Sequence, residues 1–109
     1  MAIKTNISFF RGEDVTLAIT VTDELIAGWG LAFSVAKGYG QIASFTKATG
    51  GAGITITDGA AGEFEVTIAD IDTDALATGN YVWDVKRTDA GQEVVLAYGQ
   101  LSLKPNVAT

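Results

Sequence analysis

Three features of the sequence predict an all-β protein. Apolar residues alternate with polar or small ones in several stretches, a period of two that is typical of strands with one buried and one solvated face. The 109 residues include 13 glycines and only 1 proline, and turn signals recur about every ten residues, as a protein of short strands requires. No stretch has the apolar period of a long helix, so strands and turns account for almost the whole chain.

The alternation places short strands along the whole chain. In the clearest case, Val15, Leu17 and Ile19 share one face, and the residues between them share the other. Glycine-containing turns separate the alternating stretches, for example at residues 58–62 and 89–91. The strands are expected at residues 7–10, 15–21, 31–36, 54–57, 63–68, 81–86 and 94–98.

The number and spacing of these strands predict the fold class. They fit an antiparallel β-sandwich of the immunoglobulin type with about seven or eight short strands, and a small barrel is the alternative. A single immunoglobulin-like domain should span residues 1–109, since compact domains usually contain about 100–150 residues.

Two local details follow from this interpretation. Residues 70–77 depart from the alternation and predict one helical turn, with Asp72 or Thr73 as its cap. Tyr81 and Trp83 lie on the apolar face of their strand and are expected in the core. Tyr81 also occupies the position at which such sandwiches often place a tyrosine whose hydroxyl group bonds to nearby backbone.

The composition excludes several classes of function. The sequence contains 0 cysteines and 0 histidines, which removes disulfides, thiolate metal sites, cysteine nucleophiles and imidazole acid–base catalysis. Its 7 basic and 13 acidic residues give a net charge of −6, which offers no basic patch to nucleic acid or to an anionic membrane. We therefore expect a protein that is not an enzyme, uses no metal or cofactor, and binds neither nucleic acid nor membrane.

A cluster of aspartates has the spacing with which a calcium-binding loop begins. Asp70, Asp72 and Asp74 alternate as in an EF-hand loop. The loop would need glycine at its sixth position and glutamate at its twelfth, and these positions hold Ala75 and Tyr81. A helical turn with a capping aspartate explains the cluster better than a metal site.

Two residue pairs carry weaker functional signals. Glu63 and Glu65 share the polar face of one strand, and glycoside hydrolysis would require one of them to have a raised pKa. A solvated face contains nothing to raise it, so surface charge is the better interpretation. Trp29 and Tyr39 fall in or near loops, where their rings could stack on a sugar. A carbohydrate-binding module is therefore the alternative function from a different class.

Four segments, taken in order, carry a family resemblance. The first is Phe-Phe-Arg-Gly-Glu-Asp-Val-Thr-Leu at residues 9–17, a charged turn that enters a strand. The second, Ile-Ala-Gly-Trp-Gly-Leu-Ala-Phe-Ser-Val at residues 26–35, is a glycine turn followed by a Phe-x-Val strand. The third joins Gly-Glu-Phe-Glu-Val at residues 62–66 to Leu-Ala-Thr-Gly-Asn-Tyr at residues 76–81, and the fourth is Gly-Gln-Leu-Ser-Leu-Lys-Pro at residues 99–105. Together they resemble the immunoglobulin-like structural domain of tailed-bacteriophage virion proteins, which occurs at the N-terminus of baseplate upper proteins and in related tail and fibre-associated proteins.

The resemblance covers about residues 7–107 and implies a virion structural protein, a component of the tail, baseplate or neck, that acts by protein–protein assembly. It implies other phage structural proteins as partners, a homo-oligomer within the virion, and no catalytic residues. A capsid decoration protein is the alternative within the same class. Because the chain ends at Thr109, we expect a stand-alone subunit. Because residues 1–6 lack the apolar core of a signal peptide, we expect assembly in the bacterial host cytoplasm.

One strand suggests where the partners bind. Residues 94–98, Val-Val-Leu-Ala-Tyr, are apolar on both faces, although a sandwich buries only one face of each strand. The parity of Leu101 and Leu103 makes the residues at 94, 96 and 98 the outward row, unless a bulge at Gly99 exchanges the two rows. The alternative is that a terminal segment, residues 105–109, covers the exposed row. The adjacent phenylalanines at residues 9–10 are likewise apolar on both faces. The interface candidates are therefore Val94, Leu96, Tyr98 and Phe10.

Overall fold

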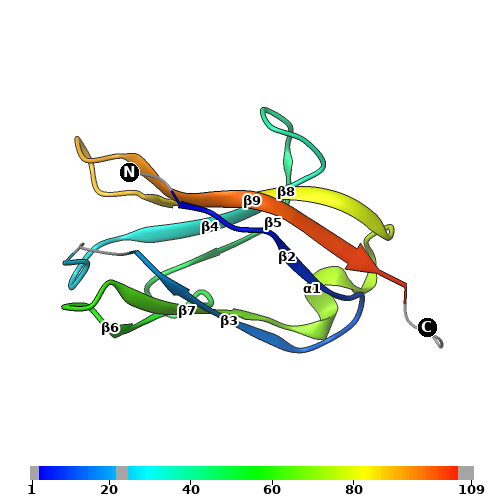
Figure 1. Ribbon diagram of the computed structural model, residues 1–109, viewed down its shortest axis with the longest axis horizontal. Coiled ribbons are helices and arrows are strands. Elements are labelled where there is room, and N and C mark those ends of the chain that lie inside the picture. The colour runs from blue at the N-terminus through cyan, green and yellow to red at the C-terminus, as the bar shows by residue number, and fades with distance from the viewer. Residues whose placement is uncertain (1–2, 22–24, 106–109) are drawn as a thin grey trace.

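The computed structural model describes residues 3–21 and 25–105 and has two β-sheets packed face to face (Figure 1). Sheet A has six strands and sheet B has three. The strands of sheet A are β1 (Ile3–Lys4), β2 (Ile7–Phe10), β4 (Leu31–Ala36), β5 (Ala43–Ala48), β8 (Gly79–Arg87) and β9 (Val94–Lys104). The strands of sheet B are β3 (Val15–Thr20), β6 (Ile54–Asp58) and β7 (Glu63–Ile68).

The strand order is that of an immunoglobulin-like sandwich, as the sequence predicts. Sheet A has the order β1-β9-β8-β4-β5, and sheet B has the order β3-β7-β6. This arrangement matches the division of an immunoglobulin domain into a C, F and G sheet, extended here by one strand, and a sheet of B, E and D. All neighbours pair antiparallel except β1 and β2, which pair with β9 in parallel. Sheet A is therefore mixed.

The described residues form nine strands, more than the sequence indicates, because β1 and β5 are not visible in the alternation. The sequence of β5, Ala-Ser-Phe-Thr-Lys-Ala, contains one large apolar residue and therefore shows no alternation of large apolar and polar residues. Its Phe45 packs against Phe33 of β4, with the ring centroids 6.4 Å apart. An edge strand needs only this much apolar surface, since it lies at the margin of the core.

The core lies between the sheets and contains the rows that the alternation predicts. Phe33 of β4, Phe64 and Val66 of β7, and Trp83 of β8 are all buried. The rings of Phe33 and Trp83 lie 5.6 Å apart between centroids, at the centre of the sandwich. The prediction that Trp83 belongs to the core is confirmed.

The connection from sheet B back to sheet A contains a short helix, α1 (Asp70–Asp74), where the sequence predicts a helical turn. Its N-cap residue is Ala69, and Asp72 at the N3 position caps the free Ala69 amide, from which its carboxylate accepts a hydrogen bond of 2.8 Å. The prediction of a capping role is therefore confirmed for Asp72 and wrong for Thr73, whose buried hydroxyl accepts a hydrogen bond of 2.9 Å from the Gly12 amide. The two side chains hold α1 to the adjacent backbone.

Tyr81 closes the same corner from β8. Its hydroxyl group donates a hydrogen bond of 2.7 Å to the carbonyl oxygen of Ala77, four residues earlier. The ring is buried, and the bond ties the start of β8 to the loop that leaves α1. The corner tyrosine predicted from the sequence is confirmed.

Candidate functional site

The two outer faces of the sandwich differ in composition. The residues of sheet B that alternate with its core rows are mainly threonine and glutamate, namely Thr16, Ala18, Thr20, Thr55, Thr57, Glu63, Glu65 and Thr67. The central outward residues of sheet A are smaller, and we define the A face as the partly exposed residues Ala32, Ser34, Ala36, Val82, Asp84 and Tyr98. The exposed Lys86 and Lys4 lie at its border, opposite Ala32 and Tyr98. Within the A face Asp84 is the one charged residue, and small side chains around a tyrosine with little charge are typical of the centre of a protein-binding surface. The A face is therefore the better candidate for an interaction surface.

The middle row of the A face crosses three strands. Asp84 on β8 lies opposite Ser34 on β4 and opposite Tyr98 on β9. The next row has Ala36, Val82 and Gln100 in the same arrangement. Every member of the A face is only partly exposed, since each is flanked by strands on both sides or by the connection between β4 and β5.

A groove of about 230 Å³ lies on this surface. Its floor includes Ser34, Ala36, Val82 and Asp84, and its wall is the β4–β5 connection, residues 37–42, with Tyr39. The connection projects away from the sandwich in Figure 1, and the Tyr39 side chain is 64% exposed. Tyr39 gives the groove an exposed aromatic ring and Asp84 a half-buried carboxylate, and Ser34, Gln41 and Lys86 add polar side chains to its lining.

The carboxyl group of Asp84 is the ionisable group at the centre of the A face. Burial raises the pKa of Asp84 above its ordinary value, and the ammonium group of Lys86 partly opposes this effect. Water therefore solvates the carboxylate poorly even before any partner binds. A partner that donated a hydrogen bond or a positive charge to Asp84 would relieve this cost.

The last strand is where the structure differs most from the predicted interface. Leu96 is 5% exposed, so its prediction as an outward residue is wrong. Val85 pairs with Ala97 and Lys86 pairs with Val95, which leaves Leu96 as the extra residue of a β-bulge. The bulge turns the neighbouring residues Leu96 and Ala97 both toward the core. The sequence allows a bulge at Gly99, and the observed bulge lies three residues earlier, at Leu96.

The other three interface candidates keep exposed surface but do not form one patch. Tyr98 belongs to the A face. Val94 is 49% exposed at the start of β9, and Phe10 lies beside Lys104 at the end of that strand. Ten residues of extended chain separate the two ends by about 33 Å. Residues 106–109, which were considered as a cover for this strand, lie outside the described residues.

Asp70 and Asp72 of the aspartate cluster take part in an ion pair and hydrogen bonds within the protein. Asp72 forms an ion pair of 2.6 Å with Lys47 of β5, and the carboxylate of Asp14 accepts a hydrogen bond of 2.8 Å from the Asp70 amide. Within residues 3–21 and 25–105, no group of three or more acidic, histidine or cysteine side chains could hold a metal ion. Glu63 and Glu65 lie on the outer face of sheet B, in agreement with their interpretation as surface charges.

The two loop aromatics of the carbohydrate hypothesis have different surroundings. The guanidinium of Arg87 lies 4.0 Å from the centroid of the Trp29 ring and covers one of its faces. Tyr39 lines the groove on the A face, and Trp29 does not. The two rings therefore do not form a shared platform around that groove.

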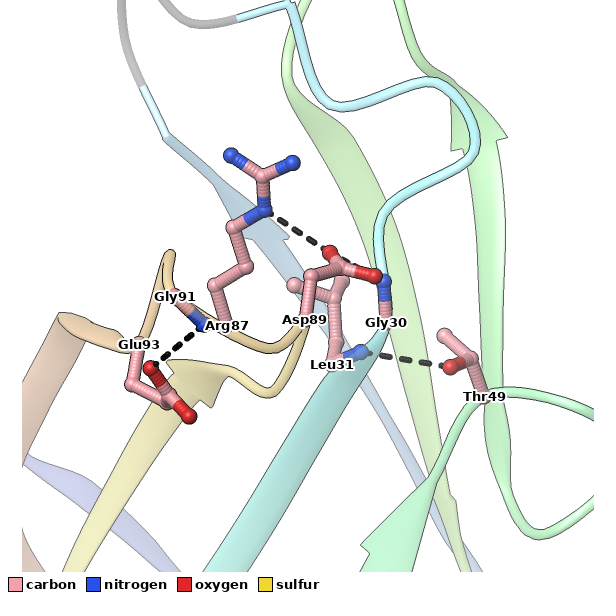
Figure 2. A network of polar contacts seen from close by, with 7 residues as sticks. All are labelled: Gly30, Leu31, Thr49, Arg87, Asp89, Gly91 and Glu93. Atoms are coloured by element: carbon pink, nitrogen blue, oxygen red, sulfur yellow. Dashed lines mark hydrogen bonds and ion pairs between the residues drawn. The ribbon is translucent and has the colours of Figure 1, made fainter.

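A polar network fixes the Arg87 side chain and the strands near it (Figure 2). Arg87 Nε donates to Asp89 at 2.8 Å, and the same carboxylate accepts from the Gly30 amide at 3.0 Å. These two bonds hold the pKa of Asp89 below its ordinary value. The Leu31 amide donates to the Thr49 hydroxyl at 3.2 Å, which ties the start of β4 to the turn that follows β5. These hydrogen bonds give Arg87, Asp89 and Thr49 a structural role, because they hold the ends of neighbouring strands together.

Sequence reasoning did not identify Ser34, Val82 or Asp84 as candidate site residues. A signal was available in the strand at residues 31–36, where the outward positions hold Ala32, Ser34 and Ala36 instead of charged residues. This row and Tyr98 belong to one surface only because β8 lies between β4 and β9, and the order of the strands in the sheet is not visible in the sequence.

No protein-family model matches the sequence, and no curated protein is significantly similar to it. Among the described residues, no helix has the length and apolar character needed to cross a membrane. The fold is therefore assigned from the strand order and the core, and any function has to be argued from the surface.

Proposed function

We propose that this chain is a structural subunit of a tailed-phage particle and that it acts by binding other particle proteins through the A face. The resemblance of its four segments to a phage immunoglobulin-like domain supports the class of particle. The small side chains of the A face carry the choice of surface, because a sheet surface with small side chains around Tyr98 permits close contact with a partner.

The proposed action is assembly without chemistry. Asp84 is flanked by Ser34, Tyr98 and Lys86, and among the described residues no hydrogen bond joins the Ser34 hydroxyl to Asp84 or Lys86, so we assign no nucleophile to this surface. In this role Asp84 would accept a hydrogen bond from the partner, and Tyr39 would close over the contact from the β4–β5 connection. The binding energy would come from surface burial and from this central polar contact.

A capsid decoration protein is the nearest alternative, since it would also use a sheet face to bind neighbouring subunits. The location of the subunit separates the two functions. Immunoelectron microscopy of particles that contain an epitope-tagged chain should place the label on the tail, baseplate or neck. Label distributed over the head would assign the chain to capsid decoration and overturn the proposed location.

The first experiment asks whether the chain belongs to a particle at all. An epitope-tagged chain, supplied during particle production in the bacterial host, should sediment with purified particles in a fixed ratio to the other structural proteins. A chain found only in the soluble fraction would contradict the proposal. Titration of the purified chain with sugars should leave its tryptophan fluorescence unchanged, whereas a saturable response would favour a carbohydrate-binding module.

The second experiment tests the surface. Ser34→Lys combined with Val82→Lys adds two long charged side chains next to Asp84, one opposite it on β4 and one two residues before it on β8. Their charges are opposite to that of the carboxylate, so folding should be retained. Incorporation into particles should fall sharply. The matched control is Thr55→Lys combined with Thr67→Lys on the outer face of sheet B, which should leave incorporation unchanged. Equal incorporation of both folded variants would exclude the A face as the contact surface.

A further inference from the structure

The outer edge of β3 is the second surface of interest. We propose that this edge binds an extended strand of a partner protein, with apolar side chains at alternate positions and a basic residue at the end that lies beside Glu13 and Asp14. The inference rests on the proposed assembly function and names the chemistry of one partner. It depends on the backbone of β3, on the groove beside it and on the charge around it.

The backbone of β3 has hydrogen-bonding groups that no described residue uses. The Val21 amide donates to the Gly62 carbonyl at 2.8 Å, which makes that cross-strand pair a hydrogen-bonded one. Because such pairs alternate along an antiparallel ladder, Val15, Leu17 and Ile19 also bond to β7. The amide and carbonyl groups of Thr16, Ala18 and Thr20 therefore point toward the open edge. Within residues 3–21 and 25–105, β7 is the one strand that pairs with β3.

The inward row of β3 is less covered than the rows of its neighbours. Val15, Leu17 and Ile19 are only half-buried, whereas the inward residues of β4 and β7 are buried completely. The reason is that β1 and β2 pair with β9 in sheet A, so none of the described strands flanks β3 on this side. Burying these side chains further would add apolar contact area.

A groove of about 260 Å³ runs along this edge. It is lined by residues 16–20 of β3 and, on the opposite side, by Thr5, Ile7, Trp83 and Ala97. Its volume lies below the range of about 300–1,000 Å³ that is typical of small-molecule pockets. Individual apolar side chains fit such a groove, and a strand bonded to the β3 edge would point every second side chain into it.

The charge of the molecule selects among possible strands. The edge Val-Thr-Leu-Ala-Ile-Thr has no charged residue and no proline, the features with which exposed edges are usually protected from pairing. Exposed Glu13 and Asp14 precede it, and the chain has a net charge of −6. A second copy of this chain would bring the same negative charge, whereas a basic residue at the end of a partner strand beside Glu13 and Asp14 would be attracted.

Amide hydrogen exchange, followed by NMR, tests the proposal residue by residue. The probe is a blocked synthetic peptide, Lys-Thr-Val-Thr-Val-Thr-Val-Lys. Saturating peptide should slow exchange of the Thr16, Ala18 and Thr20 amides by at least about tenfold, because these amides gain acceptors, and should change the amides of Leu17 and Ile19 less. The same peptide with glutamate in place of both lysines should bind more weakly, since whichever of its ends lies beside Glu13 and Asp14 would then be negative. Absence of protection on β3 at millimolar peptide, or equal binding of the acidic peptide, would overturn the proposal.

A matched pair of proline variants tests the edge itself. Ala18→Pro removes an amide that faces the open edge and leaves the bonds to β7 intact. Thr46→Pro does the same on the open edge of β5, because the Thr49 amide bonds to the Leu31 carbonyl and the ladder alternates from there. Peptide protection should be lost in the first variant and kept in the second. Equal protection in both would contradict the assignment to β3.

Two further measurements distinguish binding of the peptide to β3 from misfolding of the variant and from self-association. If Ala18→Pro does not fold, the peptide can be modified instead. N-methylation of the peptide amides that donate to the β3 edge should abolish binding. N-methylation of the amides in between, which point away from β3, should leave binding unchanged. Protection that rises with protein concentration, without peptide, would identify a second copy as the occupant and overturn the basic-peptide assignment. Particle incorporation of the unmodified chain is measured separately. Its persistence alongside a negative peptide result would refute only this inference, and its absence would refute the proposed function.

Discussion

The indole Nε1 of Trp83 on β8 donates a hydrogen bond of 3.0 Å to the carbonyl oxygen of Thr5, between β1 and β2. This bond joins the N-terminal segment to the largest side chain of the core across 78 positions in the sequence. The same carbonyl passes directly over Gly99, where a Cβ atom would lie 1.7 Å from it. A tryptophan and a glycine on neighbouring strands therefore determine how the first strands cross sheet A.

Gly99→Ala should destabilise the protein by about 1–3 kcal/mol, because the added methyl group forces the Thr5 carbonyl away from Trp83 and overpacks the site. Urea denaturation measures the change. Gly38→Ala is the control, since its Cβ would meet only the flexible end of the Gln41 side chain. Equal midpoints for the two variants would show that Thr5 moves at no cost.

Trp83→Ala should lower the free energy of unfolding by about 3–5 kcal/mol, as a large truncation in a closed core. Part of the loss reflects the Thr5 carbonyl, which is left without its donor. Urea unfolding followed by circular dichroism gives the difference. A midpoint near that of the parent protein would contradict the central position of Trp83.

Tyr81→Phe should cost about 0.5–1.5 kcal/mol, because it removes the bond to the Ala77 carbonyl and keeps the buried ring. Tyr98→Phe, on the partly exposed A face, serves as the control and should change the free energy of unfolding less. If the two substitutions cost the same, the corner hydrogen bond contributes nothing specific.

Calcium should not stabilise the protein. Asp72 is paired with Lys47, and its carboxylate also accepts from the Ala69 amide, so the aspartate cluster is not free to surround an ion. The melting temperature should be the same in millimolar calcium and in a chelator. A rise of several degrees with calcium would reveal a binding site.

Asp84 and Asp89 should have opposite effects on the dependence of stability on pH. The folded-state pKa of Asp84 is raised above the ordinary value of about 3.9, so its contribution becomes less favourable as the pH rises from that value through the folded pKa. Asp84→Asn should therefore stabilise the protein at pH 7, by less than about 1 kcal/mol because the group is partly solvated, and have little effect below about pH 3.

The folded-state pKa of Asp89 is lowered, chiefly by Arg87 and the Gly30 amide, so its stabilising contribution is present above the unfolded pKa and is lost as the pH falls through the folded pKa. Asp89→Asn should therefore destabilise the protein at pH 7 and have little effect at the acid end. Urea titrations of both variants at several pH values compare the two slopes. Slopes of the same sign would contradict one of the two assignments.

Most strands and most of the core can be read from the sequence because alternation is a local property. Leu31, Phe33 and Val35 are buried in β4 as their parity predicts, and Tyr81 and Trp83 are buried in β8 for the same reason. Each of these assignments needs only the residues within one strand. The corner bond of Tyr81 is equally local, since its acceptor is four residues away.

Only the tertiary structure decided the features that depend on a partner strand. The bulge at Leu96 exists because β9 must match β8 on both sides of it, and that mismatch is invisible in the sequence of β9 alone. The A face likewise needs β8 between β4 and β9, and the open edge of β3 results from the pairing of β1 and β2 with β9 instead. The sequence by itself determined which residues alternate toward a core, because that choice is made within each strand. Pairing and register belong to contacts between distant segments, so the surfaces available to partners were determined only when the chain folded.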